Sequence, residues 1–507
     1  MTKYAQNNVK LLHCFILTLI LGFFAYGYAF TNFTPAHDGI MTVTHDQAWQ
    51  TAIGRGLMQY YVRLRGQVDA PWLIGCLTLV YTSLAVYFTV KILGIEDELW
   101  KIFVVSAVFT LNISFICSAA VYIYLLDIYA LSLLLAVLAV WTYETINNRA
   151  LAVPASGIIL SLSMGLYQSY FAVAIALFIF LVIKMIMGQK DNLRTIITNA
   201  LYMICTAGIG AVLYSLTLKA IQNITGVEPY DSYNSVSNIS NLSVKSVISS
   251  IPGCYRSCYN FFFKSQPYAN NLFVIINVAF IILAIIMYSY CLIRFKSNVN
   301  RILLVLTIVI FPLGANCIYI LSSGMIHYLM VFSYQTFYLL MLFPLLNNDF
   351  KIGGGTANRL VTALVLILSF VVIRFSNDLF YYQKLVGEGT EASITGILYD
   401  LERYPEFDEN SMQIVMIGHP GIAIGQNYEM VDLYGSYPGV GNAGTTITYE
   451  SVFQSYLHYV LGRNYNFNYS EEVAQEIIES EGYQEMSAYP QEGYIRVIDG
   501  YLVLKFE

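Results

Sequence analysis

Apolar residues occur along most of this chain in runs of about twenty, separated by short polar stretches. A helix needs about twenty apolar residues to cross a bilayer. The pattern predicts an α-helical polytopic membrane protein with about eleven transmembrane helices. These lie near residues 11–30, 72–92, 101–118, 121–143, 153–168, 170–187, 197–218, 272–293, 302–321, 328–346 and 360–376.

Composition agrees with this pattern and divides the chain in two. Of its 507 residues, 57% are hydrophobic and 11% are charged, whereas a soluble domain carries about 25% charged residues. Residues 377–507 hold 20 acids and 5 bases, and residues 1–376 hold 12 acids and 21 bases. We therefore expect a transmembrane domain at 1–376 and a separate acidic domain at 377–507.

Lysine and arginine predict the orientation of the chain. They are frequent in alternate short loops, near residues 91–101, 184–194 and 294–301, and absent from the loops near residues 119, 169 and 322–327. Because basic loops remain in the cytoplasm, the N-terminus is predicted to be cytoplasmic in a bacterial inner membrane. An odd number of spans then places residues 377–507 outside. The first apolar run is too long for a cleaved signal peptide.

Three extracytoplasmic regions follow from this topology: a first loop at 31–70, a second at 219–271 and the domain at 377–507. The pattern of residues 377–507 predicts a small α/β domain. Its pattern predicts a helix at 378–403, a buried strand from Met412 to Gly418 and a helix that begins at Ser470. Alternation over 494–506, around Asp499-Gly500, indicates a hairpin.

The first external loop concentrates polar chemistry. Thr44 and Gln47 form a capping box, which predicts that a helix begins there. Trp49, Ile53, Leu57, Tyr60 and Leu64 would then share one face, and Arg55, Gln59 and Arg63 the opposite face. Arginines in such a row suit a phosphate, because guanidinium binds phosphate oxygens with two hydrogen bonds. The alternative is an interfacial helix whose arginines meet lipid headgroups.

Asp38 lies between His37 and Gly39, before that helix. A carboxylate at the membrane edge can accept a proton as a general base. The alternative is a turn aspartate, which is a common use of Asp-Gly. Asp46 also has two interpretations, since an acid in the first turn of a helix is favoured by the helix dipole.

Further polar residues are predicted at the outer ends of spans, on the same side as Asp38. An acid inside a membrane is costly and is therefore a candidate functional residue, and Asp127 follows Tyr122 in such a position. Gln168, Asn316 and His327 join them. We expect these residues to converge on one site, although each alone is also consistent with a hydrogen-bonded core residue.

Cysteine gives no sign of a metal site. Six of the eight cysteines lie in predicted spans, and Cys254 and Cys258 lie in the second external loop without a second pair of ligands. No tight cluster of acids and no glycine-rich phosphate loop stands out. The sequence therefore predicts no metal and no other cofactor.

At these residues the chain resembles the bacterial polytopic glucosyltransferases that modify O-antigen and other surface polysaccharides (Gtr type II-like), within the GT-C class of membrane glycosyltransferases. The resemblance covers most of residues 1–376. It is carried by His37-Asp38-Gly39, Asp46 with Trp49, Gly54-Arg55, Arg65-Gly66 before Pro71, Tyr122-x-Tyr124-x-x-Asp127, Tyr167-Gln168-Ser169-Tyr170, and Pro312 through Asn316 to His327.

The resemblance implies a glycosyltransferase that moves a hexose, expected to be glucose, from a polyprenyl-phosphate carrier to a cell-surface polysaccharide or teichoic acid on the outer face, with inversion. It implies that Asp38 is the catalytic base and that Arg55, with Arg63 or Arg65, holds the carrier phosphate. The expected partners are this donor, the polymer acceptor and the bilayer, with no nucleic acid. Sugar and acceptor contacts would come from His37, Asp46, Tyr122, Asp127, Gln168, Asn316 and His327.

Two other functions fit a basic, aromatic membrane groove. A polyprenyl-linked glycan flippase would use the same groove without chemistry, but transporters often contain repeated halves, and none is evident here. A polysaccharide polymerase also has many spans and external arginines, but it would lack the early His-Asp turn.

Overall fold

The computed structural model describes residues 3–32, 39–40, 48–66, 69–230, 243–265, 267–268, 270–324, 326–347, 354–409, 411–418 and 450–506. The chain divides into two compact units. The helical unit comprises Met1–Phe30, Asp46–Ala119 and Leu125–Asn377. The tail unit comprises Thr31–His45, Ala120–Tyr124 and Asp378–Glu507.

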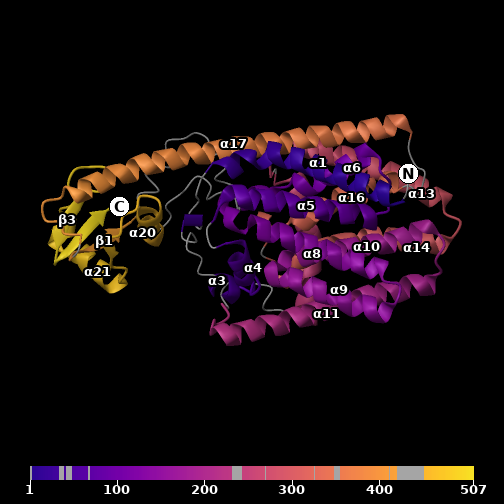
Figure 1. Ribbon diagram of the computed structural model, residues 1–507, viewed down its shortest axis with the longest axis horizontal. Helices are drawn as coiled ribbons and strands as arrows, with labels where there is room; N and C mark the ends of the chain where they lie inside the picture. The colour runs from indigo at the N-terminus through magenta and orange to yellow at the C-terminus, as the bar shows by residue number, and fades with distance from the viewer. Residues whose placement is uncertain are drawn as a thin grey trace. The chain divides into compact units, whose positions relative to one another are not determined.

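Up to residue 347 the described chain is helical throughout (Figure 1). The α-helices are α1 (Lys3–Thr31), α3 (Ala48–Ala52), α4 (Met58–Arg65), α5 (Pro71–Ile92), α6 (Leu99–Thr110), α7 (Ile113–Val121), α8 (Leu126–Thr145), α9 (Arg149–Leu166), α10 (Phe171–Gly188), α11 (Leu193–Thr225), α12 (Val244–Phe263), α13 (Asn271–Arg294), α14 (Asn298–Ala315), α15 (Cys317–Leu321) and α16 (Thr336–Leu346). The 3-10 turns are η1 (Ile123–Leu125), η2 (Gln168–Tyr170), η4 (Tyr328–Met330) and η5 (Phe332–Gln335).

The prediction of an α-helical polytopic membrane protein is confirmed. Within the described residues, nine helices are long and apolar enough to cross a membrane, or ten if α6 and α7, bent by 43°, form one span. The predicted span at 302–321 is interrupted at Asn316, where α14 ends and α15 follows. The segment predicted to span at 328–346 begins as two 3-10 turns and continues as the shorter helix α16.

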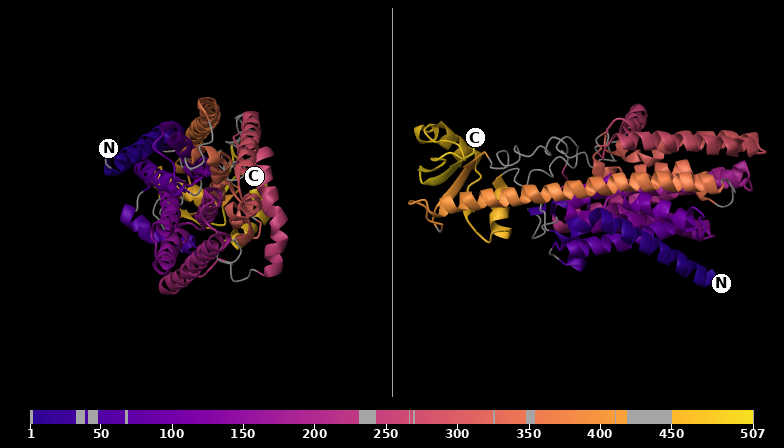
Figure 2. Two further views of the ribbon diagram at one scale, coloured as in Figure 1. Left: turned by 90° about the vertical axis from the view of Figure 1, so that its right-hand side faces the viewer. Right: turned by 90° about the horizontal axis from the view of Figure 1, so that it is seen from above.

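Small and hydroxyl-bearing residues allow the helices of the helical unit to approach closely. Helix α8 packs against α5 and α9, and α9 packs against α11 (Figures 1 and 2). A Cβ atom at Gly157 would lie within 3.0 Å of Ile209, so glycine is needed where α9 meets α11. Ser132 and Ser163 hydrogen-bond each other across α8 and α9 over 3.1 Å. Small residues and interhelical hydrogen bonds are typical of helix packing in membranes.

One end of the helical unit is held together by the loop between α5 and α6. Lys10, Lys184 and Asn347 each donate a hydrogen bond to a backbone carbonyl within residues 92–95, over 2.7, 3.0 and 2.8 Å respectively. These three residues come from the start of α1, from α10 and from the residue after α16. Parts of the chain far apart in sequence are thus tied to the same loop.

Helix α17 (Gly355–Glu402) is shared by the two units, and Asn377 is its last residue in the helical unit. The predicted helix at 378–403 is therefore the continuation of a helix that begins in the last predicted span. The other elements of the tail unit are β1 (Gln413–Ile417), α20 (Glu450–Tyr459), β2 (Asn466–Phe467), α21 (Glu471–Glu479), α22 (Glu481–Gln484), β3 (Ile495–Ile498) and β4 (Tyr501–Lys505).

The tail unit contains a four-stranded sheet in the order β2-β1-β4-β3. Strand β1 is parallel to β2 and β4, and β3 pairs antiparallel with β4. Asp499 and Gly500 join β3 to β4 with φ values of 49° and 84°, the conformation that the Asp-Gly signal predicts for a tight hairpin. Ser470 caps α21 by accepting a hydrogen bond from the backbone N–H of Val473. The α/β prediction for the tail is confirmed.

Alternate residues of the central strands build a core on each face of this sheet. Ile414 and Leu504 belong to one buried cluster with residues of α17 and α20. Val415 and Val503 belong to a second cluster with residues of α21 and α22. The period of two along a strand therefore accounts for a sheet covered by helices on both sides.

Candidate active site

The loop that follows α1 contains two short helices, α3 and α4, joined by a turn at residues 53–57. Gly54 has a φ of +95°, a conformation that glycine adopts at little cost. The prediction of one helix running through residues 49–64 is therefore wrong, because the helix is interrupted at Gly54. The predicted capping residues Thr44 and Gln47 lie outside the described part of the chain.

Side chains from two distant elements hold this turn. The Gln168 amide nitrogen donates to the backbone carbonyl of Ile53 over 3.2 Å and to the Tyr214 hydroxyl over 2.9 Å. The Tyr214 hydroxyl in turn donates to the carbonyl of Gly54 over 2.9 Å. A Cβ atom at Gly54 would lie within 3.0 Å of both polar groups. Glycine is thus required both by the backbone conformation and by the space available.

Arg55 follows immediately, and its contacts include several neutral groups. Its Nη1 donates to the Gln50 side-chain oxygen over 2.8 Å and to the Tyr129 hydroxyl over 3.2 Å. Its guanidinium carbon lies 4.6 Å from the centre of the Tyr167 ring, and the rings of Tyr129 and Tyr167 stack 4.2 Å apart. An amide and two phenol rings help to orient the guanidinium, whose charge an aromatic face stabilises.

Arg65, at the end of α4, binds two carboxylates. Its Nη1 lies 2.7 Å from Asp127 on α8, and its Nη2 lies 2.8 Å from Asp69. The side chains of Arg65 and Asp127 are 1% and 0% exposed. Buried charges are stable only when paired in this way. The predicted candidates Arg65 and Asp127 therefore lie together, and Asp69 completes an enclosed ion cluster.

Tyr61 extends this cluster to the neighbouring turn of α4. Its hydroxyl donates to Asp127 over 2.9 Å and lies 3.3 Å from the Tyr81 hydroxyl of α5. Burial, and after it the negative charge of Asp127, raise the pKa of the Tyr61 hydroxyl well above its ordinary value. The Tyr61 hydroxyl thus remains protonated at physiological pH and can donate its hydrogen bond to Asp127.

The other predicted site residues are distributed more widely. Asn316, between α14 and α15, donates to the carbonyl of Cys254 on α12 over 3.0 Å, and Cys254 donates through Sγ to the carbonyl of Asn316 over 3.2 Å. Arg63 and His327 are exposed. Tyr122 belongs to the tail unit, where its ring contacts that of Tyr124. His37, Asp38 and Asp46 lie outside the described residues.

Two networks therefore contain four of the eight predicted site residues that the structure describes. One joins Gln168 to the turn that carries Arg55, and the other joins Arg65 to Asp127. Helix α8 links them, because Asp127 and the Arg55 partner Tyr129 are two residues apart on it. The prediction that Asn316 and His327 join the same site stays a prediction.

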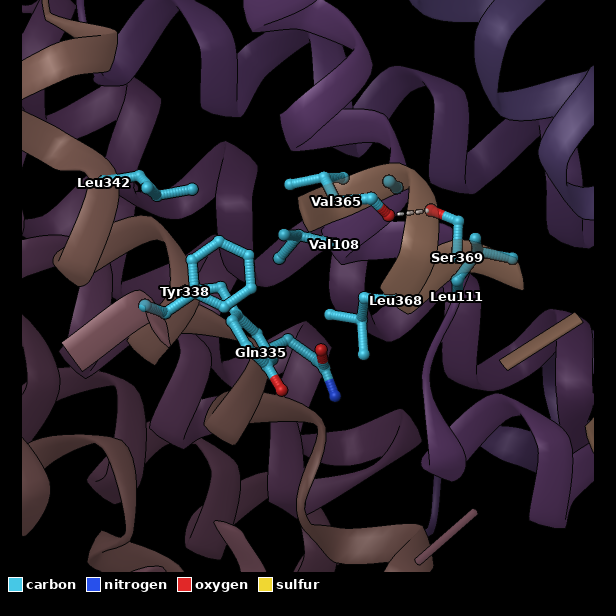
Figure 3. A pocket seen from close by; sticks show the side chains of 10 residues that line it. Val108, Leu111, Gln335, Tyr338, Leu342, Val365, Leu368 and Ser369 are labelled. Carbon is cyan, nitrogen blue, oxygen red and sulfur yellow. Dashed lines mark hydrogen bonds between the residues drawn. The ribbon is translucent and has the colours of Figure 1, made fainter. Parts of the chain in front are cut away.

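A cavity elsewhere in the helical unit is lined by mostly apolar side chains. Figure 3 shows Gln335 and Tyr338 from η5 and α16 facing Leu368 and Ser369 of α17, with Val108 of α6 and Leu111, the residue that follows α6, beside them. The Ser369 hydroxyl donates a hydrogen bond to the backbone carbonyl of Val365 over 2.7 Å. The lining includes none of the predicted site residues, so this cavity is a feature apart from the two networks.

The sequence model of a family described as Glucosyl transferase GtrII matches residues 27–345 of the chain. This range runs from the end of α1 through α16 and includes both networks around Arg55 and Arg65. The chain belongs to the GtrII glucosyl transferase family. Membership makes this membrane protein a glycosyltransferase with a sugar donor and a polysaccharide acceptor. No curated protein and no solved structure matches the chain.

Several residues of the GtrII networks were missed in the sequence. Tyr129, Gln50 and Tyr214 bind the turn or Arg55, and Asp69 shares Arg65 with Asp127. A tyrosine within an apolar run is usually a core or interfacial residue, so its hydroxyl gives no separate signal. Asp69 was detectable, because it stands four residues after Arg65, a spacing at which opposite charges often pair.

Within the described ranges, no group of three or more His, Cys, Asp or Glu residues is arranged to hold a metal ion. The described acids of the GtrII networks, Asp69 and Asp127, are both bound to Arg65.

Proposed function

We propose that this GtrII protein transfers glucose, or a closely related hexose, from a polyprenyl-phosphate carrier to a cell-surface polysaccharide or teichoic acid, with inversion at the anomeric carbon. The reaction takes place on the extracytoplasmic side of a bacterial inner membrane. The observation that carries the proposal is Arg55, a guanidinium oriented by Gln50, Tyr129 and Tyr167 in the loop between α1 and α5 of a glucosyl transferase family member.

The chemistry needs a base and a group that stabilises the leaving phosphate. An acceptor hydroxyl attacks the anomeric carbon, and the bond from that carbon to the carrier phosphate oxygen breaks with its electron pair. The hydroxyl proton passes to the carboxylate of Asp38, our candidate base. Arg55 stabilises the negative charge on the departing polyprenyl phosphate, for which a rigidly held cation is most effective.

The remaining candidates are assigned to binding. Arg63 is exposed and free to reach a carrier phosphate. We propose contacts to donor sugar or acceptor from His37, Asp46, Tyr122, Gln168, Asn316 and His327. Gln168 and Asn316 also bind the protein backbone, so their substitution would affect loop structure as well as substrate.

Arg65 and Asp127 were also predicted to bind substrate, and this stays a prediction. Each already has the other as an enclosed ionic partner. Direct binding would require substrate to replace a buried ion pair. Their contacts favour an additional role, in which the ion pair fixes α4 against α8 and so holds the loop that carries Arg55.

The proposed orientation has the N-terminus in the cytoplasm and residues 377–507 outside. It is supported by the position of Lys10 and Lys184, which bind the loop between α5 and α6 at one end of the helical unit. Helices α3 and α4 are drawn at the other end in Figure 1. We propose residues 1–376 as the transferase domain and residues 377–507 as the extracytoplasmic domain.

The proposal is tested by transfer in proteoliposomes. Purified protein receives radiolabelled polyprenyl-phosphate-glucose and a crude surface polysaccharide, and label in the polymer is measured for wild type, Asp38→Asn and Glu228→Gln. Glu228 is an exposed acid after α11 and serves as the matched loss of one carboxylate. We expect transfer by wild type and Glu228→Gln, and a loss of at least about 100-fold in Asp38→Asn, the effect typical of a general base.

Equal transfer by Asp38→Asn and wild type would show that Asp38 is not the catalytic base. Asp46 would then be the next candidate. Absence of transfer by the wild type with several donor sugars and acceptors would contradict the proposed reaction. Carrier movement across the bilayer without transfer would instead support a flippase.

A further inference from the structure

The short helix α3 ends in a turn whose backbone carbonyls are bound from outside the helix. The last carbonyls of a helix have no partner within it, and a buried carbonyl needs a donor. Here the carbonyls of residues 51, 52, 53 and 54 each accept a hydrogen bond from a distant part of the sequence. Arg55 directly follows the last of these carbonyls.

Most of the donors belong to α11 or to the chain just after it. They are the side chains of Tyr214 and Gln222 and the backbone N–H of Tyr230, which bind the carbonyls of Gly54, Thr51 and Ala52 over 2.9, 3.3 and 3.2 Å respectively. The remaining donor is Gln168 of η2, which binds the carbonyl of Ile53 over 3.2 Å. The predicted second external loop, which begins at residue 219, is thus attached to the turn of the first.

The same face of α11 also packs against this turn. Tyr214, Leu218 and Gln222 recur every four residues and therefore share one side of the helix, and all three are buried. A Cβ atom at Gly56 would lie 3.2 Å from Ile221 and 3.3 Å from Leu218. The turn and the outer part of α11 are therefore in close apolar contact as well as hydrogen-bonded.

We propose that α11 is a positioning element of the transferase, in which Tyr214, assisted by Gln222, sets the position of Arg55. This inference rests on the proposed role of Arg55 in binding the carrier phosphate. The carbonyl of Gly54 and the N–H of Arg55 belong to one planar peptide group. Tyr214 binds the oxygen of this group, and its N–H donates to the carbonyl of Gln50 over 2.7 Å. Both ends of the peptide that carries Arg55 are therefore fixed.

Tyr214→Phe tests this role, because it removes the hydroxyl and keeps the ring that packs against Met164. Misplacing a reacting group by about 1 Å can reduce the rate about 100-fold, so the loss of one anchor should lower kcat/KM about 10-fold. Gln222→Met should lower kcat/KM less, because the carbonyl of Thr51 also accepts a hydrogen bond from the N–H of Gly54 over 3.1 Å.

A combination with Arg55→Gln separates positioning from a structural role. Residues that act through one contact have non-additive effects, whereas independent residues have additive effects. Once Arg55 is replaced, Tyr214→Phe should therefore lower kcat/KM by less than about twofold. Additive losses of kcat/KM in the double variant would overturn the proposal, because Tyr214 would then act independently of Arg55.

The matched control is Tyr143→Phe. The Tyr143 hydroxyl of α8 donates to the backbone carbonyl of Asn199 over 3.2 Å, so this variant also removes a tyrosine hydroxyl that binds α11, but at a distance in sequence from Tyr214. We expect kcat/KM close to wild type. A loss equal to that of Tyr214→Phe would overturn the proposal, because any weakening of α11 packing would then explain both.

Hydrogen exchange of the peptide at residues 49–58 gives a measurement that does not depend on activity. The backbone N–H groups of Gly54 and Arg55 form hydrogen bonds within the turn. They should exchange faster in Tyr214→Phe than in wild type or in Tyr143→Phe. Unchanged exchange in Tyr214→Phe would overturn the proposal, because the hydroxyl would then not hold the turn.

Failure of the proposed function gives a different result. Wild-type protein would then show no transfer with any donor, while exchange at residues 49–58 would still report whether Tyr214 holds the turn. If wild type is active and Arg55→Gln is equally active, Arg55 is not needed for transfer. That result would overturn the positioning role as well, and the proposed reaction would remain.

Discussion

At the scale of single residues, Arg55 is our candidate for holding the carrier phosphate. Lysine carries the same charge as arginine, but it has no planar fork of donors. We expect Arg55→Lys to raise the donor KM about 10-fold and Arg55→Gln to lower kcat/KM about 100-fold, as for the loss of one charge-stabilising donor. Initial rates over a range of donor concentrations provide the measurement.

The control for this prediction is Arg256→Gln, which removes an exposed positive charge from α12. It should have kcat/KM close to wild type. If kcat/KM falls as much in Arg256→Gln as in Arg55→Gln, the reaction depends in general on positive charge outside the membrane. Arg55 would then have no special contact with the carrier phosphate.

The ion cluster around Arg65 gives a second prediction at this scale. Removing one partner of a buried ion pair costs about 3–5 kcal/mol, because the other charge stays buried and unpaired. Arg65→Ala should therefore destabilise the protein strongly, and Arg65→Ala/Asp127→Ala should destabilise it by much less than the sum of the single changes. Thermal unfolding in detergent measures both, and additive losses would show that the two side chains do not interact.

The sequence predicted these residues unevenly. Asp127 was identifiable because an acid in an apolar run is costly, and such an acid must have a partner. Arg65 was selected for another reason, as a phosphate ligand, since the pairing with Asp127 spans 62 residues of sequence and has no local pattern. The tyrosines around Arg55 were not distinguishable from the many others in apolar runs, because burial and catalysis select the same aromatic residue.

At the scale of elements, the long apolar runs were predicted well and the short external helices were not. Apolar residues recur at helical spacing from Trp49 to Leu64, so the pattern continues across a position where the helix stops. The interruption at Gly54 is stabilised by hydrogen bonds from Gln168 of η2 and Tyr214 of α11 to the backbone of the turn. A periodic pattern reports which faces are apolar, and it does not contain these tertiary hydrogen bonds.

This turn makes its own prediction. Gly54→Ala places a methyl group against Gln168 and Tyr214 in a backbone conformation that alanine rarely adopts. We expect it to displace Arg55, lower kcat/KM at least about 10-fold, and destabilise the protein by more than about 1 kcal/mol. Gly208→Ala is the control, since Gly208 lies in α11 with open space around its Cα, and there alanine favours the helix.

Transfer assays and thermal unfolding of the two glycine variants are compared on the same preparation. Wild-type activity and stability in Gly54→Ala would mean that the turn relaxes without cost and does not set the position of Arg55. A loss in Gly208→Ala as large as that in Gly54→Ala would attribute the effect to any added methyl group.

At the scale of the whole molecule, the sequence indicated a basic membrane part and an acidic tail, but not how the tail unit is composed. The charge split and the hairpin at Asp499-Gly500 are local signals. The burial of Ile40 beside residues of α17 and β4 is a long-range contact, and an apolar residue between Gly39 and Met41 looks the same whether it meets lipid or a protein core. Composition therefore located the tail domain and missed its contribution from the first loop.

Orientation is the property of the whole molecule on which the proposed donor depends. A polyprenyl-phosphate donor used outside the cell requires Arg55 and the tail unit on the extracytoplasmic side. Basic short loops remain in the cytoplasm, so the loop between α13 and α14 should be inside. We expect Glu492→Cys, exposed in the tail unit, to react with a membrane-impermeant maleimide in intact spheroplasts, and Lys296→Cys, exposed in that loop, to react only after permeabilisation.

The protein without either substitution shows how much the eight native thiols react. Labelling of Lys296→Cys in intact spheroplasts, with protection of Glu492→Cys, would reverse the orientation. Arg55 would then face the cytoplasm, where soluble activated sugars are available and a lipid carrier is not required for delivery. The chain would still belong to the GtrII glucosyl transferase family, but the proposal of a polyprenyl-phosphate donor would lose its physical basis.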